Sequence, residues 1–468
     1  MKRHISLLII TVMAISMLLS MTGCDFLKSL NPPKINGVKL SKYQIVCDED
    51  GLDYNTRAAE YIRDSIRERS GVKLDIVDDS ATEGEYEIVV GETSRAISKK
   101  LDAECEGLEF AIMADGGDIA LEGDYFIIAA AAYYFIETYS FTPGHIIAFA
   151  DDTIVCEPIV REAKNFIMLI GDGMGVYQTK IFDYMDRDVE YSDGEDFFYG
   201  YMLPYQGFSR TRSYSGITDS AAGGTALSCG YKTYNEYIGR DKDMNDIKSL
   251  TELSFDIGKS AAVMSTENQK GATPAAFSAH ADSRNSSSAI LESQLDAMLK
   301  YGTIIDCGFD YYTDKYMRNV IEKGITDTLA EVSANENGFF LMYEEAHIDK
   351  HCHKNDINKT YDVVVRFNQA IARFMEFAFY HPDTFVLITA DHETGGLAPD
   401  ENGKLAYSTE EHSADDVPVF AWGYGADAID DKTVENIEIA KLFASLMGVE
   451  NFGDQSDEWK NIIYGTEE

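Results

Sequence analysis

The chain has 468 residues, 80 of them acidic and 40 basic, which gives a formal net charge of −40 at pH 7. A protein with this much negative charge is repelled by nucleic acids and by anionic lipids. We therefore exclude these partners and expect good solubility. The chain is longer than a single domain of ordinary size, so we expect at least two domains.

The first 23 residues have the pattern of a lipoprotein signal peptide. A basic start precedes an apolar stretch over residues 5–21, which is followed by Thr22, Gly23 and Cys24. The stretch is close to the ~17-residue minimum of a membrane span and has no basic segment after it, so a cleaved signal is favoured. We expect lipid on Cys24 to anchor the exported chain to the outer face of the cytoplasmic membrane or in the cell envelope. An ordinary secretory peptide is the alternative, and residues 24–33 are expected to form a tether.

Residues 34–156 are predicted to form a small α+β accessory domain. A helix is expected over 55–69, because Ala58, Ile62 and Ile66 fall on one apolar stripe. The other expected elements are strands over 43–47, 72–77 and 86–90, a hairpin that pairs 110–114 with 118–121, and a helix over 124–139. With Val89-Val90-Gly91-Glu92-Thr93 in a turn, the region is similar to the small non-catalytic domains ahead of some glycoside hydrolases. We interpret it as a spacer or packing domain, with glycan or envelope binding as the alternative.

From about residue 160 to residue 468 the chain alternates buried strands with helices. The predicted strands cover 166–170, 261–265, 338–342, 385–389 and 419–423, and a long amphipathic helix covers 360–380. This alternation predicts an α/β fold with a mainly parallel sheet flanked by helices on both faces. The acidic run over 184–197 is expected to be a solvated loop near the mouth of the site.

Ser220 is a candidate nucleophile. It follows Asp219 at the head of a run of small residues, up to Leu227, that predicts a helix. A serine at this position meets unpaired backbone N–H groups and the positive end of the helix dipole, which suits attack on the phosphorus of an anion. An Asp-Ser pair is also a common helix cap, and alone that is the more frequent explanation.

Residues that can bind metal ions follow three of the buried strands, at the edge where α/β sheets place their sites. These residues are Asp172 after the first strand, Glu344, Asp349 and His353 after the second, and Asp391 and His392 after the third. Asp349 and His353 are four apart, so on a helical turn they face the same way. Clustered carboxylates repel one another unless a cation is bound. Carboxylate with imidazole is the ligand mix of zinc, and carboxylates with a hydroxyl suit magnesium.

In combination these segments resemble the metal-dependent alkaline phosphatases, over about residues 164–445. The matching segments are Gly171-Asp172-Gly173-Met174-Gly175, Thr218-Asp219-Ser220-Ala221-Ala222, Ala272-Thr273-Pro274-Ala275-Ala276 with Ser283-Arg284, Glu344 with Ile348-Asp349-Lys350 and His353, Asp391-His392, and His412. Each type of ligand that the family uses occurs in the family's order.

The resemblance implies that Ser220 is the nucleophile, that Arg284 binds two phosphate oxygens, and that Asp219 orients Arg284. It also implies two Zn²⁺ ions and one Mg²⁺ ion. The implied ligands are Asp349, His353 and His412 for one zinc, Asp172, Asp391 and His392 for the other, and Asp172, Thr273 and Glu344 for magnesium. The implied activity is hydrolysis of small phosphomonoesters through a phosphoserine intermediate, with an alkaline optimum. Family members are often homodimers, so a homodimer is one option.

One position departs from the family pattern. Gly271 stands two residues before Thr273, where better-known members carry an Asp or a His, so we expect a weaker or differently occupied magnesium site. We interpret His347, His351 and Cys352 as non-ligands, although a thiolate at Cys352 would bind zinc well.

Two other functions remain open at this point. A phosphodiesterase or sulfatase of the same superfamily would usually carry a threonine or a modified cysteine as nucleophile. Ser220 with Arg284 favours a monoester, because Arg284 would compete for space with a second ester group. A non-catalytic, envelope-binding lipoprotein is the third possibility, and the intact set of ligand types argues against it.

Overall fold

The computed structural model describes residues 28–48, 53–101, 105–185, 197–301, 305–308 and 316–465. The expected signal peptide, the lipid attachment site Cys24 and most of the acidic run at 184–197 lie outside the described residues. The chain divides into two compact units between Ile159 and Val160. Among the helices in the described ranges, none combines the length and the apolar character that crossing a membrane requires.

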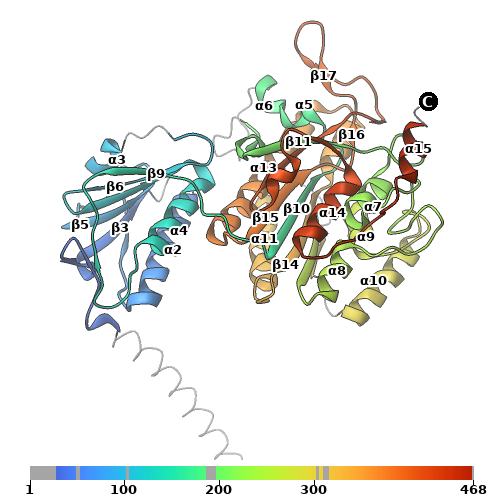
Figure 1. Ribbon diagram of the computed structural model, residues 1–468. Helices are drawn as coiled ribbons and strands as arrows, with labels where there is room; N and C mark the ends of the chain where they lie inside the picture. Colours follow the sequence, from blue (N-terminus) through green and yellow to red (C-terminus); the bar gives the residue numbers. More distant parts are fainter. Residues whose placement is uncertain are drawn as a thin grey trace, which may run out of the picture. The chain divides into compact units, whose positions relative to one another are not determined.

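The N-terminal unit is built on a mixed six-stranded sheet, drawn in blue to green in Figure 1. In spatial order its strands are β4 (Ile76–Asp78), β3 (Tyr43–Cys47), β5 (Tyr86–Val90), β7 (Asp118–Glu122), β6 (Phe110–Asp115) and β9 (Thr153–Cys156). The first four strands run parallel, and β6 is antiparallel to both of its neighbours. A small second sheet joins β2 (Val38–Lys39), β1 (Lys34–Ile35) and β8 (Ile146–Ile147).

Helices cover both faces of this N-terminal sheet. Helices α2 (Asp53–Ser70) and α4 (Ile128–Thr138) pack against each other and against the sheet, and the predicted stripe of α2 is buried. Helix α3 (Ala96–Lys100) packs with Val46 and Val89, which alternate with the residues that face α2 and α4. The expected strand over 72–77 begins only at Ile76, because Val72 and Leu74 are buried by packing without joining the ladder.

The C-terminal unit is built on an eight-stranded sheet. In spatial order its strands are β13 (Ile305–Gly308), β12 (Ser260–Ser265), β14 (Phe339–Glu345), β10 (Asn165–Gly171), β15 (Thr384–Thr389), β20 (Val417–Trp422), β11 (Tyr205–Arg210) and β21 (Thr433–Glu435). All pairings are parallel except the two made by β20. This is the mainly parallel α/β fold that the sequence predicts, with one reversed strand inside it.

Two layers of helices bury the faces of this sheet, as Figure 1 shows. Alternate residues of β10, including Phe166 and Met168, form a core with α8 (Leu250–Asp256), α9 (Ala272–Ser278) and α14 (Asn436–Leu446). The opposite face is covered by α11 (Tyr316–Val332) and the long α13 (Ile357–Tyr380), whose Phe367 stacks on Tyr343 of β14. The described part of the unit also contains the α-helices α5 (Val176–Thr179), α6 (Ile181–Tyr184), α7 (Ser220–Cys229), α10 (Ser287–Tyr301), α12 (His347–Cys352) and α15 (Glu458–Tyr464).

The register of the central strands aligns the residues that follow them. Ile170 of β10 is paired with Glu344 of β14 on one side and with Thr389 of β15 on the other. Strand β14 runs to Glu345, three residues beyond the predicted end, so Glu344 lies within the strand. The carboxyl ends of these strands therefore meet at one edge of the sheet, which is where α/β proteins place their sites.

A buried ion pair, Arg95 with Glu87, stabilises the N-terminal unit: Arg95 Nε donates to Glu87 Oε2 at 2.7 Å, and both side chains are buried. We predict that Arg95→Met lowers the free energy of opening of this unit by about 3–5 kcal/mol, because an uncompensated buried carboxylate remains. Hydrogen–deuterium exchange of peptides from 34–156 measures the loss. In the control Lys42→Met, which breaks an exposed pair with Glu85, the change should stay below about 1 kcal/mol. An equal effect of both substitutions would contradict the prediction.

Candidate active site and metal centre

Ser220 is the first residue of α7 (Ser220–Cys229), a helix in which every residue is buried. Asp219 caps this helix, since its Oδ1 accepts a hydrogen bond from Ala222 N at 2.9 Å. Small residues are needed because the helix lies against the sheet edge: a Cβ added at Gly223 would be 2.8 Å from Asp391 O. The close approach brings the Ser220 hydroxyl, at the positive end of the helix dipole, to the edge where the strands end.

Asp219 also holds Arg284. Its Oδ2 accepts hydrogen bonds from Arg284 Nη1 at 3.2 Å and from Glu236 N at 3.0 Å. The backbone closes the arrangement, because Arg284 N donates to Glu236 O at 2.8 Å. One carboxylate therefore caps the helix with one oxygen and orients the guanidinium with the other. The Arg284 side chain is 34% exposed, so it can meet an anion that arrives from solvent.

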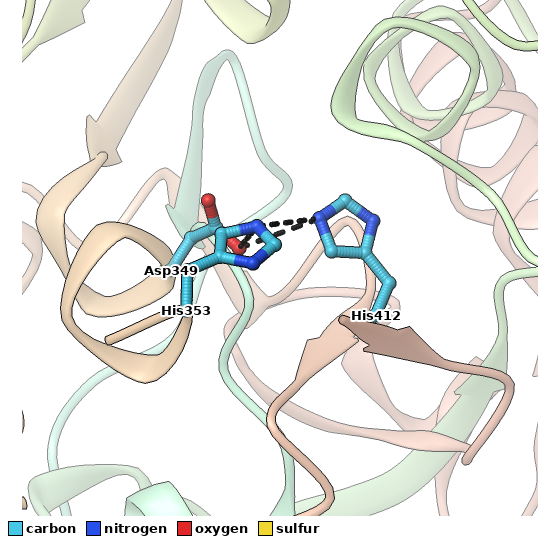
Figure 2. Close-up of side chains that lie close together, drawn as sticks. All are labelled: Asp349, His353 and His412. Carbon is cyan, nitrogen blue, oxygen red and sulfur yellow. Dashed lines mark hydrogen bonds and ion pairs between the residues drawn. The ribbon is translucent and has the colours of Figure 1, made fainter. Parts of the chain in front are cut away.

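Asp349, His353 and His412 point toward one another, as Figure 2 shows. Asp349 lies in the short helix α12 (His347–Cys352), His353 follows that helix, and His412 begins strand β19 (His412–Ser413). Asp349 Oδ1 is 3.2 Å from His353 Nε2 and 3.5 Å from His412 Nε2. The two Nε2 atoms are 3.1 Å apart. The predicted i, i+4 pair thus meets a third ligand from a segment more than fifty residues further along the chain.

Both imidazoles use their other ring nitrogen to donate a hydrogen bond. His353 Nδ1 is bonded to Glu410 O, and His412 Nδ1 lies 2.9 Å from Thr218 O. A carbonyl oxygen only accepts, so each Nδ1 carries its proton, and in a neutral imidazole the Nε2 atom keeps a lone pair. Two such lone pairs at this distance repel unless a proton or a metal ion lies between them. Such back-bonding of Nδ1 is typical of histidines that bind metal through Nε2.

His392 directs its Nε2 at the nucleophile and at two carboxylates. The Nε2 atom is 3.2 Å from Ser220 Oγ, 3.5 Å from Asp172 Oδ1 and 3.4 Å from Asp391 Oδ2. Asp172 and His392 also lie within ligand distance of Asp349, which is therefore near both groups of ligands. Ser220 thus lies beside a set of carboxylate and imidazole groups that suits zinc.

Thr394 connects the group of Asp349, His353 and His412 with the group around His392. It was not among the predicted site residues. Its hydroxyl donates to Asp349 Oδ1 at 2.6 Å and lies 3.2 Å from His392 Nδ1. Since that hydroxyl proton goes to Asp349, the Thr394 oxygen can accept from His392 Nδ1, and His392 Nε2 is again left with its lone pair. The only signal in the sequence is the position of Thr394, two residues after His392.

The third group of ligands contains oxygen atoms only. Glu344 and Thr273 are fully buried, and Ser265 Oγ donates to Glu344 Oε2 at 2.5 Å. Four buried oxygens around the site make no hydrogen bond within the described residues. They are Asp172 Oδ1, Thr273 Oγ1, Glu344 Oε1 and Asp391 Oδ2. Buried polar atoms without partners are costly, and bound cations would satisfy them.

Burial and mutual repulsion shift the pKa values of the clustered side chains. Burial raises the pKa of Asp172 well above its usual range, and the charges of Asp391, Asp349 and Glu344 raise it further. Burial, followed by the charge of Asp349, raises the pKa of Asp391 to about 6. Hydrogen bonding to Asp349 raises the pKa of His353 to about 9. The residues present therefore fit divalent metals that bind carboxylate, imidazole and hydroxyl groups.

Cys352 and His351 lie apart from these groups of ligands. Cys352 Sγ is 3.6 Å from Tyr407 Oη and 3.8 Å from Thr360 Oγ1, and burial raises the pKa of its thiol to about 12. Burial lowers the pKa of His351 to about 4. Cys352 belongs to neither group of potential metal-binding atoms found among the described residues, and its role as a non-ligand stays a prediction.

Comparison with known proteins identifies the family. A family model described as Alkaline phosphatase matches residues 163–303 and 306–407. Alkaline phosphatase 4 of Bacillus subtilis is 30% identical over 305 residues, which cover 53% of this chain and 65% of that protein. The alkaline phosphatase of Escherichia coli is 26% identical over 400 residues, which cover 64% of this chain and 84% of that protein. The chain thus matches less than two thirds of the length of the Bacillus protein.

Solved structures agree with the sequence comparison. The alkaline phosphatase from the Antarctic bacterium TAB5 has a TM-score of 0.53 at 25% identity, over 62% of this chain and 99% of that chain. A variant of the TAB5 enzyme with bound Mg has a TM-score of 0.54 at 26% identity, over 62% of this chain and 100% of that one. The chain belongs to the alkaline phosphatase family, and its C-terminal unit has the fold of that family.

We predict that divalent metal stabilises the folded chain, because cations relieve the repulsion among the clustered carboxylates. At a free zinc concentration about 100-fold above Kd, the melting temperature should rise by about 5–10 °C, as followed by thermal denaturation. His412→Ala should lower the bound zinc by one ion in elemental analysis and reduce this rise. In the control His145→Ala, which changes an exposed residue of the N-terminal unit, both quantities should equal those of the parent. A melting temperature that zinc leaves unchanged would contradict the prediction.

Proposed function

We propose that the chain is an exported, metal-dependent phosphomonoesterase, an alkaline phosphatase that acts through a phosphoserine at Ser220. The observation that carries the proposal is the position of Ser220 Oγ, 3.2 Å from His392 Nε2 at the start of α7. Arg284, held by the helix cap Asp219, supplies a cation on the same side of that helix end. A nucleophile and a phosphate-binding group beside clustered metal ligands are the parts that phosphoryl transfer requires.

In the proposed reaction Arg284 binds two phosphoryl oxygens and Ser220 attacks phosphorus in line. A bond forms between Ser220 Oγ and phosphorus while the bond from phosphorus to the ester oxygen breaks. The hydroxyl proton passes to solvent, and the leaving alkoxide takes a proton from solvent and departs as an alcohol. Water then cleaves the bond between Oγ and phosphorus, which restores the Ser220 hydroxyl and releases inorganic phosphate.

The residues that would hold metal ions are those at the sheet edge. We assign Asp349, His353 and His412 to one zinc ion, Asp172, Asp391 and His392 to the other, and Asp172, Thr273 and Glu344 to magnesium. When bound, these ions would lower the pKa of the attacking hydroxyl and neutralise the charge on the phosphoryl oxygens. Support comes from the unpartnered buried oxygens, the orientation of the three imidazoles and the family of the chain.

Export and lipid anchoring belong to the same proposal, and they rest on the sequence pattern of residues 1–24. We infer cleavage before Cys24 and attachment of lipid to its thiol. An anchored enzyme of this kind would meet small phosphomonoesters outside the cytoplasmic membrane.

The first test compares monoester with diester turnover. Zinc-loaded protein should hydrolyse p-nitrophenyl phosphate faster than bis(p-nitrophenyl) phosphate, and EDTA should abolish turnover until zinc is restored. Ser220→Ala should lower kcat by about 10³-fold or more with zinc content unchanged, because the attacking oxygen is gone. The control Ser228→Ala removes a hydroxyl from the other end of α7, where it donates to Ala276 O, and should keep its activity. Faster diester turnover, or full activity of Ser220→Ala, would overturn the proposal.

The second test concerns Arg284. Arg284→Lys should weaken inhibition by inorganic phosphate by about 10- to 100-fold, because an ammonium cannot make the paired hydrogen bonds of a guanidinium, each worth about 1.5–3 kcal/mol. The inhibition constant measures this effect. Arg240→Lys is the matched control, since Arg240 pairs with Asp246 and Asp282 rather than with Asp219. Equal inhibition constants for Arg284→Lys and the parent would show that Arg284 does not bind phosphate.

A further inference from the structure

The side chain of Glu267, four residues earlier in the chain, fills the space beside Gly271. A Cβ added at Gly271 would lie 2.5 Å from Glu267 Cδ and would overlap Glu267 Oε1. Gly271 is the cap of helix α9, which carries Thr273. A carboxylate is therefore present at this position of the site, although residue 271 has no side chain to supply one.

Hydrogen bonds connect Glu267 with the buried Glu344. Glu267 N donates to Ser265 Oγ at 3.0 Å, and Ser265 Oγ donates to Glu344 Oε2 at 2.5 Å. The Glu267 carboxylate is also bonded to Lys350, the residue after Asp349, and its side chain is only 20% exposed. The Ser265 contact holds the Glu267 backbone beside Glu344, and the ion pair with Lys350 holds the carboxylate.

Two buried oxygen atoms indicate that a cation belongs beside Glu267. Glu344 Oε1 and Thr273 Oγ1 belong to fully buried residues and make no hydrogen bond within the described parts of the chain. A cation bound next to the Glu267 carboxylate would satisfy both oxygens.

We propose that Glu267 completes the magnesium site of this chain, from a position four residues before the one that the family pattern uses. This inference rests on the proposed function, because it concerns the third cation of the same site. Glu267 adds a hard carboxylate to Asp172, Thr273 and Glu344, and no imidazole belongs to that set. Ligands of oxygen alone select Mg²⁺ over Zn²⁺. The prediction of a weaker magnesium site was based on the missing side chain at Gly271. Glu267 supplies a carboxylate at that place.

The test measures magnesium binding rather than catalysis. Full-length protein loaded with zinc and freed of magnesium is titrated with MgCl₂ in a calorimeter. Glu267→Gln should raise the Kd for Mg²⁺ by at least about 10-fold, since removal of even an outer group of a metal site costs about 10- to 100-fold in affinity. The double variant Glu267→Ala with Gly271→Asp moves the carboxylate into the space that the alanine opens, and it should regain most of the lost affinity. Zinc content and melting temperature should equal those of the parent in both variants.

Glu401→Gln is the matched control. It removes the same charge from an exposed position in the turn between β17 (Ala398–Pro399) and β18 (Leu405–Ala406), and it should leave the Kd unchanged. An unchanged Kd for Glu267→Gln would overturn the inference. A raised Kd that the double variant fails to lower would also overturn it, because the role of Glu267 would then be structural.

The role of Glu267 and the proposed phosphatase activity can be refuted independently of each other. A parent protein that hydrolyses p-nitrophenyl phosphate, but whose Mg²⁺ affinity does not depend on Glu267, retains the proposed function alone. A parent protein that binds Mg²⁺ through Glu267, but hydrolyses no phosphomonoester, retains the cation site alone.

Discussion

The repulsion among groups that share one edge of the sheet is the constraint on which the rest of the C-terminal unit depends. The Nε2 atoms of His353 and His412 are 3.1 Å apart, and Asp172 and Asp391 are buried nearby, each with an oxygen that has no hydrogen-bond partner among the described residues. Folding alone does not favour such an arrangement, because each buried charge raises the free-energy cost of burying another charge of the same sign. It persists when the surrounding structure over-determines the positions of these groups and cations are available to satisfy them.

That surrounding structure is largely backbone. Asp172 N donates to Glu345 O at 3.1 Å and Asp349 N donates to Asp172 O at 2.9 Å, so the ends of β10 and β14 are tied together. Gly173 N donates to Asp391 Oδ1 at 3.2 Å, which joins the third strand end to them. Helix α7 completes the site, since its small residues allow the helix to approach Asp391 closely. Cations bound here would meet side chains that already have the required positions. Little further ordering of these side chains would accompany binding.

Much of this was predictable from the sequence. Five of the eight strands of the C-terminal sheet were placed within a few residues of their observed bounds, whereas β11, β13 and β21 were not predicted. The rule that sites follow strand ends brought Asp172, Glu344 and Asp391 together correctly. The same rule applies to β12, whose last residue, Ser265, is followed closely by Glu267. Glu267 was not predicted, because a glycine at position 271 does not indicate which side chain fills the space beside it. Thr394 was overlooked because a threonine near a histidine has no distinctive pattern.

The sequence by itself determined the class of fold, the order of the strands along the chain and the types of ligand available. Hydrophobic periodicity and ligand chemistry are properties of short segments, and a single sequence displays them. Only the tertiary structure decided that β20 runs against its neighbours, that Asp349 lies between two groups of ligands, and that Glu267 occupies the space beside Gly271. Each of these depends on contacts between segments far apart in the chain or on the path of a side chain through packed space, and no local pattern encodes either.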